Sequence, residues 1–427
     1  MERYGTVIRR SHTRHPSPWQ SAGSTPPGGD GHLLVMPGEV RAYAHAGAPP
    51  TLRMSTTALR KLFPGRAMVL LAAMRSLPRK ITLRDVAKSA NVSVAVASRV
   101  LGNHGYVSEE KRQKVRIAAE KLGYSPNIVA RSLKTASTSC LGIVIADITT
   151  NFFTLLVRGA DDVGRQNGYH LIVCNSDEDP EKEKVHLEEL WNRKVDGIIL
   201  CPTEGNLHRL RMFTRSGMPV VLVDRRLPQL DAVSITVDNR LGAFEGVTHL
   251  LEHGYRRVAI MKGLPGIASL EERFLGYTQA LKRAGMARDP QLVRYGELNA
   301  EISRTRAGEL LELRNRPDAF FISCEAMIVG TLTAIQERGL RIPQDVGVVA
   351  FDDPLWASIL RPPLTTVRQP SYSVGTIAAQ TLISQIAGET GGLKEDITLR
   401  PELVVRGSCR EQSPSSAALP HGATLLR

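Results

Sequence analysis

The sequence predicts two unlike parts, a small all-helical unit near residue 80 and a large α/β unit after it. Residues 81–101 have the pattern of two short amphipathic helices joined by a polar turn. After residue 140, short apolar runs alternate with helical patterns, and this alternation starts again near Val258. Such an alternation indicates a parallel sheet wrapped by helices, with right-handed crossovers. Two such series predict two lobes that face each other across a cleft.

The first predicted helix begins at Thr82, in the stretch ITLRDVAKSANVSVAVASRVL. Thr82 and Asp85 have the T-x-x-D spacing of a capping box, in which two residues satisfy free amide groups at a helix start. After a polar turn, Ser93 is placed to cap the second helix. This arrangement is typical of a DNA-reading helix-turn-helix. Two packing helices of a small bundle are the alternative on this stretch alone.

The second helix turns Val94, Ala95, Ser98 and Arg99 outward when its apolar residues face inward. Small side chains permit close approach to a major groove, and arginine can pair bidentately with guanine. Hydrogen-bonded reading of bases is therefore expected mainly from Ser98 and Arg99. Val94 and Ala95 can offer only shape and contacts with thymine methyl groups.

Two further helices are expected before the α/β unit. Ser108 is placed to cap a helix over residues 109–122, and Gly123 lies just past its end. The motif YSPNIVARSLK, residues 124–134, then predicts a basic helix of about nine residues, which is too short to be stable alone in water. We interpret this last helix as a hinge that orders on binding.

The motifs TLRDVAKSANVSVAVASRVL, GYVSEEKRQKV and GYSPNIVARSLK, in this order, resemble the lactose-repressor and galactose-repressor (LacI/GalR) family of transcriptional regulators. The likeness continues to about Cys409. The resemblance implies a two-lobed, periplasmic-binding-protein-like α/β effector domain. Its chain would pass between the lobes near Asp238, near Arg368 and again near the C-terminus, and its cleft could close on a small ligand.

The resemblance also implies a homodimer that reads a near-palindromic double-stranded DNA operator. Its paired hinge helices would insert Leu133 into the minor groove, where an apolar wedge bends the duplex, with Arg131 and Lys134 beside it. The DNA-binding residues expected from the motifs and the resemblance together are Thr82, Ser93, Val94, Ala95, Ser98, Arg99, Tyr106, Ser108, Asn127, Arg131, Leu133 and Lys134.

Basic charge is concentrated toward the N-terminus. The formal net charge of +13 divides into +6 for residues 1–73, +9 for residues 74–134 and −2 for the remainder. A basic end on a neutral body is expected when one end meets DNA phosphates and the rest has another task.

Residues 1–73 do not share the resemblance and are rich in Pro, Gly, Arg, His and Ser. They are either a disordered basic tail or a mis-started extension, with Met74 or Met68 as the true start. We favour the extension, because Met74 lies just ahead of the first capped helix. The predicted domains are the extension (1–73), the helix-turn-helix domain (80–126), the hinge helix and linker (127–138), the two-lobed domain (139–410) and a disordered tail without heptads (411–427).

Polar residues follow the predicted strands, where open parallel sheets bind ligands. Asp224 ends the run VVLVD, and Asp352 ends DVGVVAFD. Arg273, in EERFLGY, matches the family's ligand-contacting arginine. A carboxylate and a guanidinium facing each other can bind vicinal hydroxyls, so a sugar-like effector is expected. A structural ion pair between the lobes is the alternative for Arg273 and Asp352.

Aromatic residues near these strand ends could face a sugar ring. Phe152 and Phe153 follow the first strand in DITTNFF, although one of the pair is expected in the core. Trp356 either stacks on the ligand or packs at the cleft rim. The expected effector-binding residues are Phe152, Phe153, Asp224, Arg273, Glu325, Asp352 and Trp356.

The sequence departs from the family pattern at two places near the cleft. The specific sugar that a family member binds therefore cannot be assigned to this chain. Thr150-Asn151 stands where relatives usually have Asn-Pro, and Cys324-Glu325 stands where they often have Asn-Asp. Glu325 is longer than aspartate by a methylene group, and Cys324 cannot donate hydrogen bonds as asparagine does.

Other function classes are disfavoured. The five cysteines are scattered without a C-x-x-C pair, so free thiols in a reducing cytoplasm are expected, with no metal or cofactor. No apolar run approaches the length of a membrane span, so no membrane partner is expected. The expected localisation is cytoplasmic and nucleoid-associated. Catalytic motifs are missing, so the chain is not expected to be an enzyme.

The sequence thus predicts an effector-responsive transcriptional regulator, in the first place a repressor. A solute-binding protein is the rival from another class, but it would carry a signal peptide and no DNA-reading unit. A nucleoid-type architectural protein whose cleft has lost its ligand is the second rival.

Overall fold

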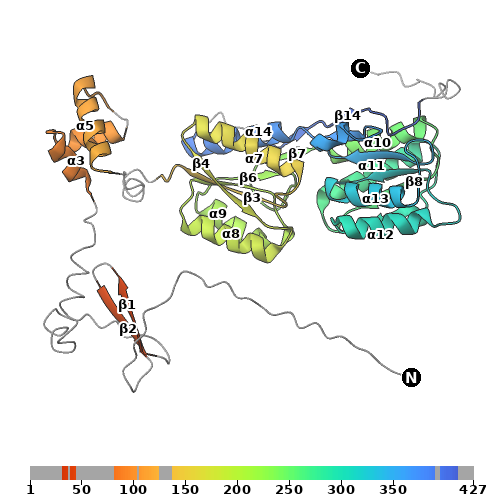
Figure 1. The fold of residues 1–427 in the computed structure, drawn as a ribbon, viewed down its shortest axis with the longest axis horizontal. Coiled ribbons are helices and arrows are strands. Elements are labelled where there is room, and N and C mark those ends of the chain that lie inside the picture. Colours follow the sequence, from red (N-terminus) through yellow and green to blue (C-terminus); the bar gives the residue numbers. More distant parts are fainter. Residues whose placement is uncertain are drawn as a thin grey trace, which may run out of the picture. The chain divides into compact units, whose positions relative to one another are not determined.

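The computed structural model describes residues 31–36, 39–44, 81–102, 105–124, 137–389 and 395–411 (Figure 1). The chain divides into two compact units, Met1–Pro126 and Asn127–Arg427. Within the first unit, strands β1 (Gly31–Met36) and β2 (Glu39–Ala44) pair in antiparallel register. This pair lies in the segment whose composition predicted disorder. The choice of start residue is not tested by the structure.

A compact three-helix domain follows, built from α3 (Leu83–Ser89), α4 (Val94–Leu101) and α5 (Glu109–Lys121). Val86, Ala97 and Val115, one from each helix, are fully buried together. Between α3 and α4 the chain turns through Asn91, which has a φ of +53°. Asparagine tolerates this left-handed conformation better than most residues, which explains its place in the turn.

Within the described residues, the N-terminal lobe of the second unit holds a six-stranded sheet in the order β13-β7-β6-β5-β3-β4, with all pairs parallel. Its strands are β3 (Cys140–Ile145), β4 (His170–Asn175), β5 (Gly197–Leu200), β6 (Val220–Val223), β7 (Ser234–Val237) and β13 (Ile397–Leu399). Its helices are α7 (Asn151–Gln166), α8 (Pro180–Asn192), α9 (Leu207–Arg215) and α14 (Ser371–Ala387).

The C-terminal lobe repeats this design, again with six described strands, in the order β14-β12-β11-β10-β8-β9. All pairs are parallel except β12 with β14, the last strand. Its strands are β8 (Val258–Lys262), β9 (Val293–Tyr295), β10 (Ala319–Ile322), β11 (Gly347–Phe351), β12 (Thr365–Arg368) and β14 (Glu402–Val404). Its helices are α10 (Asn239–Glu252), α11 (Ala268–Arg283), α12 (Ala300–Leu311) and α13 (Ile328–Glu337).

The predicted fold class is confirmed, because two parallel sheets wrapped by helices follow a small helical domain (Figure 1). In the described chain, passages between the lobes occur after β7, after β12 and after β13, as the resemblance implied. Each lobe buries apolar side chains on both faces of its sheet. The crossings place the carboxyl ends of strands from both lobes around one cleft.

Close packing of α7 against α14 gives the N-terminal lobe one of its covering layers (Figure 1). A methyl group at Gly375 would lie 1.9 Å from the carbonyl oxygen of Leu156, and one at Gly159 would lie 2.3 Å from that of Tyr372. These two glycines therefore permit a helix separation that a larger side chain would prevent.

Candidate functional site

The helix-turn-helix is capped at both of its predicted starts. Thr82 and Asp85 form the expected capping box, with Thr82 N donating to Asp85 Oδ2 at 2.9 Å. Ser93 Oγ accepts from Val96 N at 3.2 Å. Because the caps fix where each helix begins, they also fix which side chains of α4 face outward.

The outer face of α4 has the composition that the sequence predicted. Ala95 and Arg99 are exposed, Val94 is 43% exposed, and Ser98 is half-buried. A methyl group at Gly105 would lie 3.4 Å from Cδ of Arg99, so the stem of Arg99 rests beside this glycine. The aliphatic part of the Arg99 side chain is therefore held by a neighbouring residue, while its guanidinium group projects beyond it.

Near α5, the structure revises one expectation. Ser108 occupies the N-cap position, but its side chain makes no capping hydrogen bond. Glu109 and Glu110 in the first turn instead complement the positive end of the helix. Tyr106 is 93% exposed, as a DNA-contacting residue would be. The predicted hinge residues Asn127, Arg131, Leu133 and Lys134 lie outside the described residues.

The end of the linker is anchored by a residue that the sequence did not single out. Asp196, just before β5, accepts hydrogen bonds from Ser137 Oγ at 2.7 Å and from the backbone N–H groups of Thr138 and Ser139, each at 2.8 Å. This carboxylate holds the segment that leads from the predicted hinge into β3.

A cavity of about 310 Å³ lies between the two lobes. Its walls come from the ends of strands in both sheets, as expected for open parallel sheets. The predicted effector residues that line it are Phe152, Phe153, Asp224, Arg273, Glu325 and Asp352. Trp356 does not line it and packs instead against the core of the C-terminal lobe, so its expected stacking on a ligand is not supported.

Arg273 is held rigidly in the cavity wall. Its Nε donates to Asn239 Oδ1 at 2.8 Å, and its Nη1 donates to the Ser323 carbonyl at 2.7 Å and lies 3.9 Å from Asp352 Oδ2. The guanidinium also stacks 3.7 Å over the ring of Phe351. Both Arg273 and Asp352 belong to the C-terminal lobe, so their ion pair does not join the lobes.

The two strand-end aspartates occupy matching positions in the lobes. Asp224 follows β6 with a φ of +66°, and Asp352 follows β11 with a φ of +77°. Such left-handed conformations are uncommon outside glycine and gather at functional sites. Asp352 accepts from Gln369 Nε2 at 2.6 Å and from Glu325 N at 2.9 Å, so its carboxylate is firmly oriented.

Asp224 belongs to a buried charged cluster. Arg225 Nε donates to Asp224 Oδ2 at 3.1 Å, and the rest of its guanidinium binds both carboxylate oxygens of Glu178. Burial raises the pKa of Asp224, while Arg225 and Arg273 oppose that change. Ser269 of the C-terminal lobe reaches Asp224 Oδ2 at 3.5 Å.

The aromatic pair closes one side of the cavity. Phe152 and Phe153 lie edge to face, with ring centroids 4.9 Å apart, and both are buried. Both rings therefore belong to the core and also line the cavity. The sequence predicted that one of the pair lies in the core. Burial raises the pKa of the nearby Cys324 thiol to about 12, so this residue stays a neutral thiol.

Four more residues line the cavity that the sequence did not predict: Glu178, Arg225, Ser269 and Gln369. Gln369 stands out, because its Oε1 is buried without a hydrogen-bond partner among the described residues. Arg225 could have been found as the residue after a strand-end aspartate. The partners of Gln369 and Glu178 depend on contacts far apart in sequence and left no local signal.

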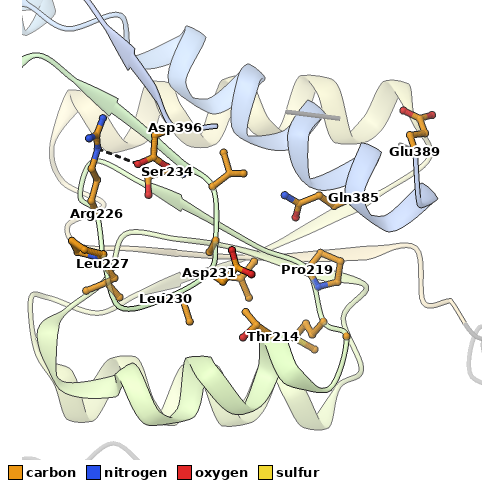
Figure 2. A pocket seen from close by; sticks show the side chains of 16 residues that line it. Thr214, Pro219, Arg226, Leu227, Leu230, Asp231, Ser234, Gln385, Glu389 and Asp396 are labelled. Atoms are coloured by element: carbon orange, nitrogen blue, oxygen red, sulfur yellow. Dashed lines mark hydrogen bonds and ion pairs between the residues drawn. The ribbon is translucent and has the colours of Figure 1, made fainter. Parts of the chain in front are cut away.

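A second hollow, of about 810 Å³, lies in the N-terminal lobe between the loop after β6 and the end of α14 (Figure 2). Arg226 and Asp396 form an ion pair there at 3.5 Å. None of its lining residues carries a buried polar atom that lacks a partner in the described structure. The cleft cavity is the better ligand site, although it is smaller, because buried charged side chains of both lobes line it.

Two further properties of the described residues bear on other functions. They contain no group of three or more His, Cys, Asp or Glu side chains placed to hold a metal ion. No helix in that part of the chain is long and apolar enough to cross a membrane.

Comparison with known proteins agrees with this architecture. The model for bacterial regulatory proteins of the lacI family matches residues 82–127, and that for a periplasmic binding protein-like domain matches residues 247–409. The transcriptional regulator RegA of Clostridium saccharobutylicum is 35% identical over 71% of this chain and 91% of its own. The transcriptional repressor CytR of Escherichia coli is 30% identical over 77% and 96%.

Solved structures show the same likeness. The lac repressor dimer bound to operator and an anti-inducer aligns with a TM-score of 0.70 and 26% identity, covering 78% of this chain and all of that one. The complex of the regulator CelR with cellobiose aligns with a TM-score of 0.58 and 29% identity, covering 77% and 99%. The chain is a transcriptional regulator of the LacI family, with a helix-turn-helix DNA-binding domain and a periplasmic-binding-protein-like domain.

Proposed function

We propose that the chain is a dimeric repressor whose affinity for a near-palindromic operator is set by a sugar-like effector in the cleft. Relatives support both halves of this proposal. One is a ribose operon repressor of Halalkalibacterium halodurans, 35% identical over 71% of this chain and 90% of its own, and another is seen bound to cellobiose. The lac repressor is seen as a dimer on its operator. Such a regulator works in the cytoplasm.

One observation carries the ligand class: Asp224, Arg273 and Asp352, all buried, converge on one cavity. Buried charged groups form strong, charge-assisted hydrogen bonds with ligand hydroxyls. Carboxylates of Asp224 and Asp352 line the same cavity and accept further hydrogen bonds. The ligand is therefore rich in hydroxyl donors, and the rings of Phe152 and Phe153 face its apolar side.

The fixed position of the Arg273 side chain also favours a ligand that is rich in hydroxyl groups. Its Nε and Nη1 are held by protein partners, which leaves Nη2 to donate to a ligand oxygen. A planar guanidinium beside a fixed carboxylate suits two neighbouring hydroxyls. Closure on such a ligand would shift the lobes and alter the spacing of the hinges, and so change operator affinity.

On the DNA side, the exposed face of α4 enters the major groove in this proposal. Ser98 and Arg99 form hydrogen bonds with base edges, and Val94 and Ala95 make close apolar contacts with the groove. Tyr106 contacts the sugar-phosphate backbone of the DNA. Leu133 of each hinge helix enters the minor groove, with Asn127, Arg131 and Lys134 at the groove edges.

Genome-wide mapping of bound sites, followed by calorimetry, tests this function. We expect a small set of near-palindromic sites, and a sugar or nucleoside from a panel suggested by the adjacent genes that binds the purified chain and alters its affinity for those sites. Uniform coating of DNA, together with no binding by any member of the panel, would favour an architectural protein instead.

A further inference from the structure

Glu325 of the C-terminal lobe reaches across the cleft to the N-terminal lobe. Its Oε2 accepts the backbone N–H of Asn151, the first residue of α7, at 2.8 Å. The side chain of Asn151 donates in turn to the backbone carbonyl of Asp353 at 3.4 Å. The start of α7 is therefore joined to the C-terminal lobe by two hydrogen bonds beside the effector cavity.

The hydrogen bond from Asn151 to Glu325 takes the place of a local side-chain cap at the start of α7. Thr150 occupies the N-cap position of α7, but its side chain makes no capping hydrogen bond. In contrast, α8 is capped by Asp179 and α12 by Asn299, each from its own lobe. A carboxyl oxygen at a helix N-terminus satisfies a free amide group, and it can accept this hydrogen bond in the neutral as well as in the ionised form. Glu325 therefore gives α7, from the other lobe, the kind of cap that α8 and α12 receive from residues of their own lobes.

We propose that Glu325 is a latch between the lobes, whose carboxyl group favours the closed cleft by capping α7 and leaves that helix start uncapped when the lobes separate. The length of glutamate matters, because aspartate, the residue that relatives often carry here, is one methylene shorter. The latch belongs to the two-lobed domain and does not depend on which effector binds.

The surroundings of Glu325 make the latch sensitive to pH. Asp147 faces it from the N-terminal lobe, and Asp352 from its own lobe, while Arg273 and Glu297 line the same cavity. Burial raises the pKa of Glu325 to about 7 from an ordinary value of 4.5; the hydrogen bond from Asn151 opposes this change, and Asp352 and Asp147 add to it. Separation of the lobes exposes the group to water and restores the ordinary value. Closure therefore takes up a proton, so the closed cleft is favoured as pH falls from about 7 toward 4.5.

Distance measurement between spin labels on the two lobes of the full chain tests the latch, without any added ligand. Val185 on α8 and Val329 on α13 are both exposed and can be replaced by cysteine for labelling, with the unsubstituted chain as the blank. We expect the wild-type distance distribution to shift toward the closed form between pH 8 and pH 5.5. Glu325→Gln, which keeps an acceptor but cannot ionise, should remove that shift.

Glu325→Asp should enrich the open form at both pH values, and hydrogen exchange should rise several-fold in the first turn of α7. Glu204→Gln is the matched control, because it removes an exposed carboxylate of the N-terminal lobe outside this cavity and should change neither measurement. Circular dichroism checks that each variant is folded. Unchanged distances and unchanged exchange in Glu325→Asp would overturn the latch, and a pH shift that persists in Glu325→Gln would overturn its coupling to a proton.

Discussion

The carboxylate of Asp196 binds Thr138 twice, through the backbone N–H at 2.8 Å and the hydroxyl group at 3.1 Å. Thr138 lies two residues before the first strand of the N-terminal lobe, on the side of the predicted hinge. Any movement of this lobe is therefore passed directly to the segment that leads toward the DNA-binding domain.

Replacing Asp196 by alanine should release this segment. Several charge-assisted hydrogen bonds are lost, so we expect the free energy of unfolding to fall by about 2–4 kcal/mol. Hydrogen exchange of residues 137–141 should rise as well. Asp231→Asn, an exposed aspartate in the same lobe, is the control and should change neither quantity. Equal exchange in wild type and Asp196→Ala would show that the anchor has no effect.

Arg99→Ala should weaken binding to the cognate operator by about 1–3 kcal/mol and relax the preference at one base position. Lys134→Ala should lower affinity for all sequences more evenly, because a phosphate contact carries no sequence information. Binding titrations on a set of single-base operator variants distinguish the two outcomes. If Arg99→Ala weakened all sequences equally, the assignment of the reading face would be wrong.

Gly375→Ala should destabilise the N-terminal lobe, because the new methyl group would overlap the Leu156 carbonyl on α7. We expect a loss of about 1–3 kcal/mol or more in urea unfolding, as in other overpacked interiors. Ser373→Ala, on the exposed side of the same helix, should stay within about 0.5 kcal/mol of wild type. A stable Gly375→Ala variant would mean that the two helices can separate at little cost.

His249 should make the chain sensitive to acid. Burial and the neighbouring His253 lower the pKa of His249 to about 4 from an ordinary value of 6.5. Unfolding restores the ordinary value, so the unfolded chain binds the proton more tightly and stability falls as pH drops from about 6.5 to 4. The loss approaches about 3 kcal/mol at the acid end.

Unfolding experiments across this pH range check the assignment. His249→Gln should reduce the slope of stability against pH, whereas His208→Gln, at an exposed position, should leave it unchanged. An identical slope in His249→Gln and wild type would assign the acid sensitivity to other groups.

Local signals predicted the features that depend on a few neighbouring residues. The caps at Thr82 and Ser93 follow from spacings of three residues, and the strand-end positions of Asp224 and Asp352 follow from the apolar runs before them. Family resemblance supplied Arg273, whose contacts with Asn239 and Ser323 no local pattern reveals.

Features that depend on folding of distant segments were missed or misjudged. Gln369 meets Asp352 because the parallel strands β11 and β12 end side by side. Glu325 meets Asn151 only because the lobes face each other. For Trp356 the sequence left open stacking on a ligand or packing at the cleft rim, and the side chain packs, partly buried, against the core of its own lobe. Ser108 has the position of a cap, but its side chain makes no capping hydrogen bond, which the sequence spacing alone does not reveal.

Control of operator affinity by a ligand in the cleft is tested most directly by operator titrations with and without that ligand. Arg273→Lys is the informative variant, since it keeps a positive charge in the wall but loses the planar fork that binds two oxygens. In the wild type we expect the ligand to change operator affinity about tenfold or more, equivalent to roughly 1.4 kcal/mol of coupling. In Arg273→Lys, operator binding without ligand should be unchanged and the ligand effect should disappear. An undiminished ligand effect in this variant, at the same ligand concentration, would contradict the account.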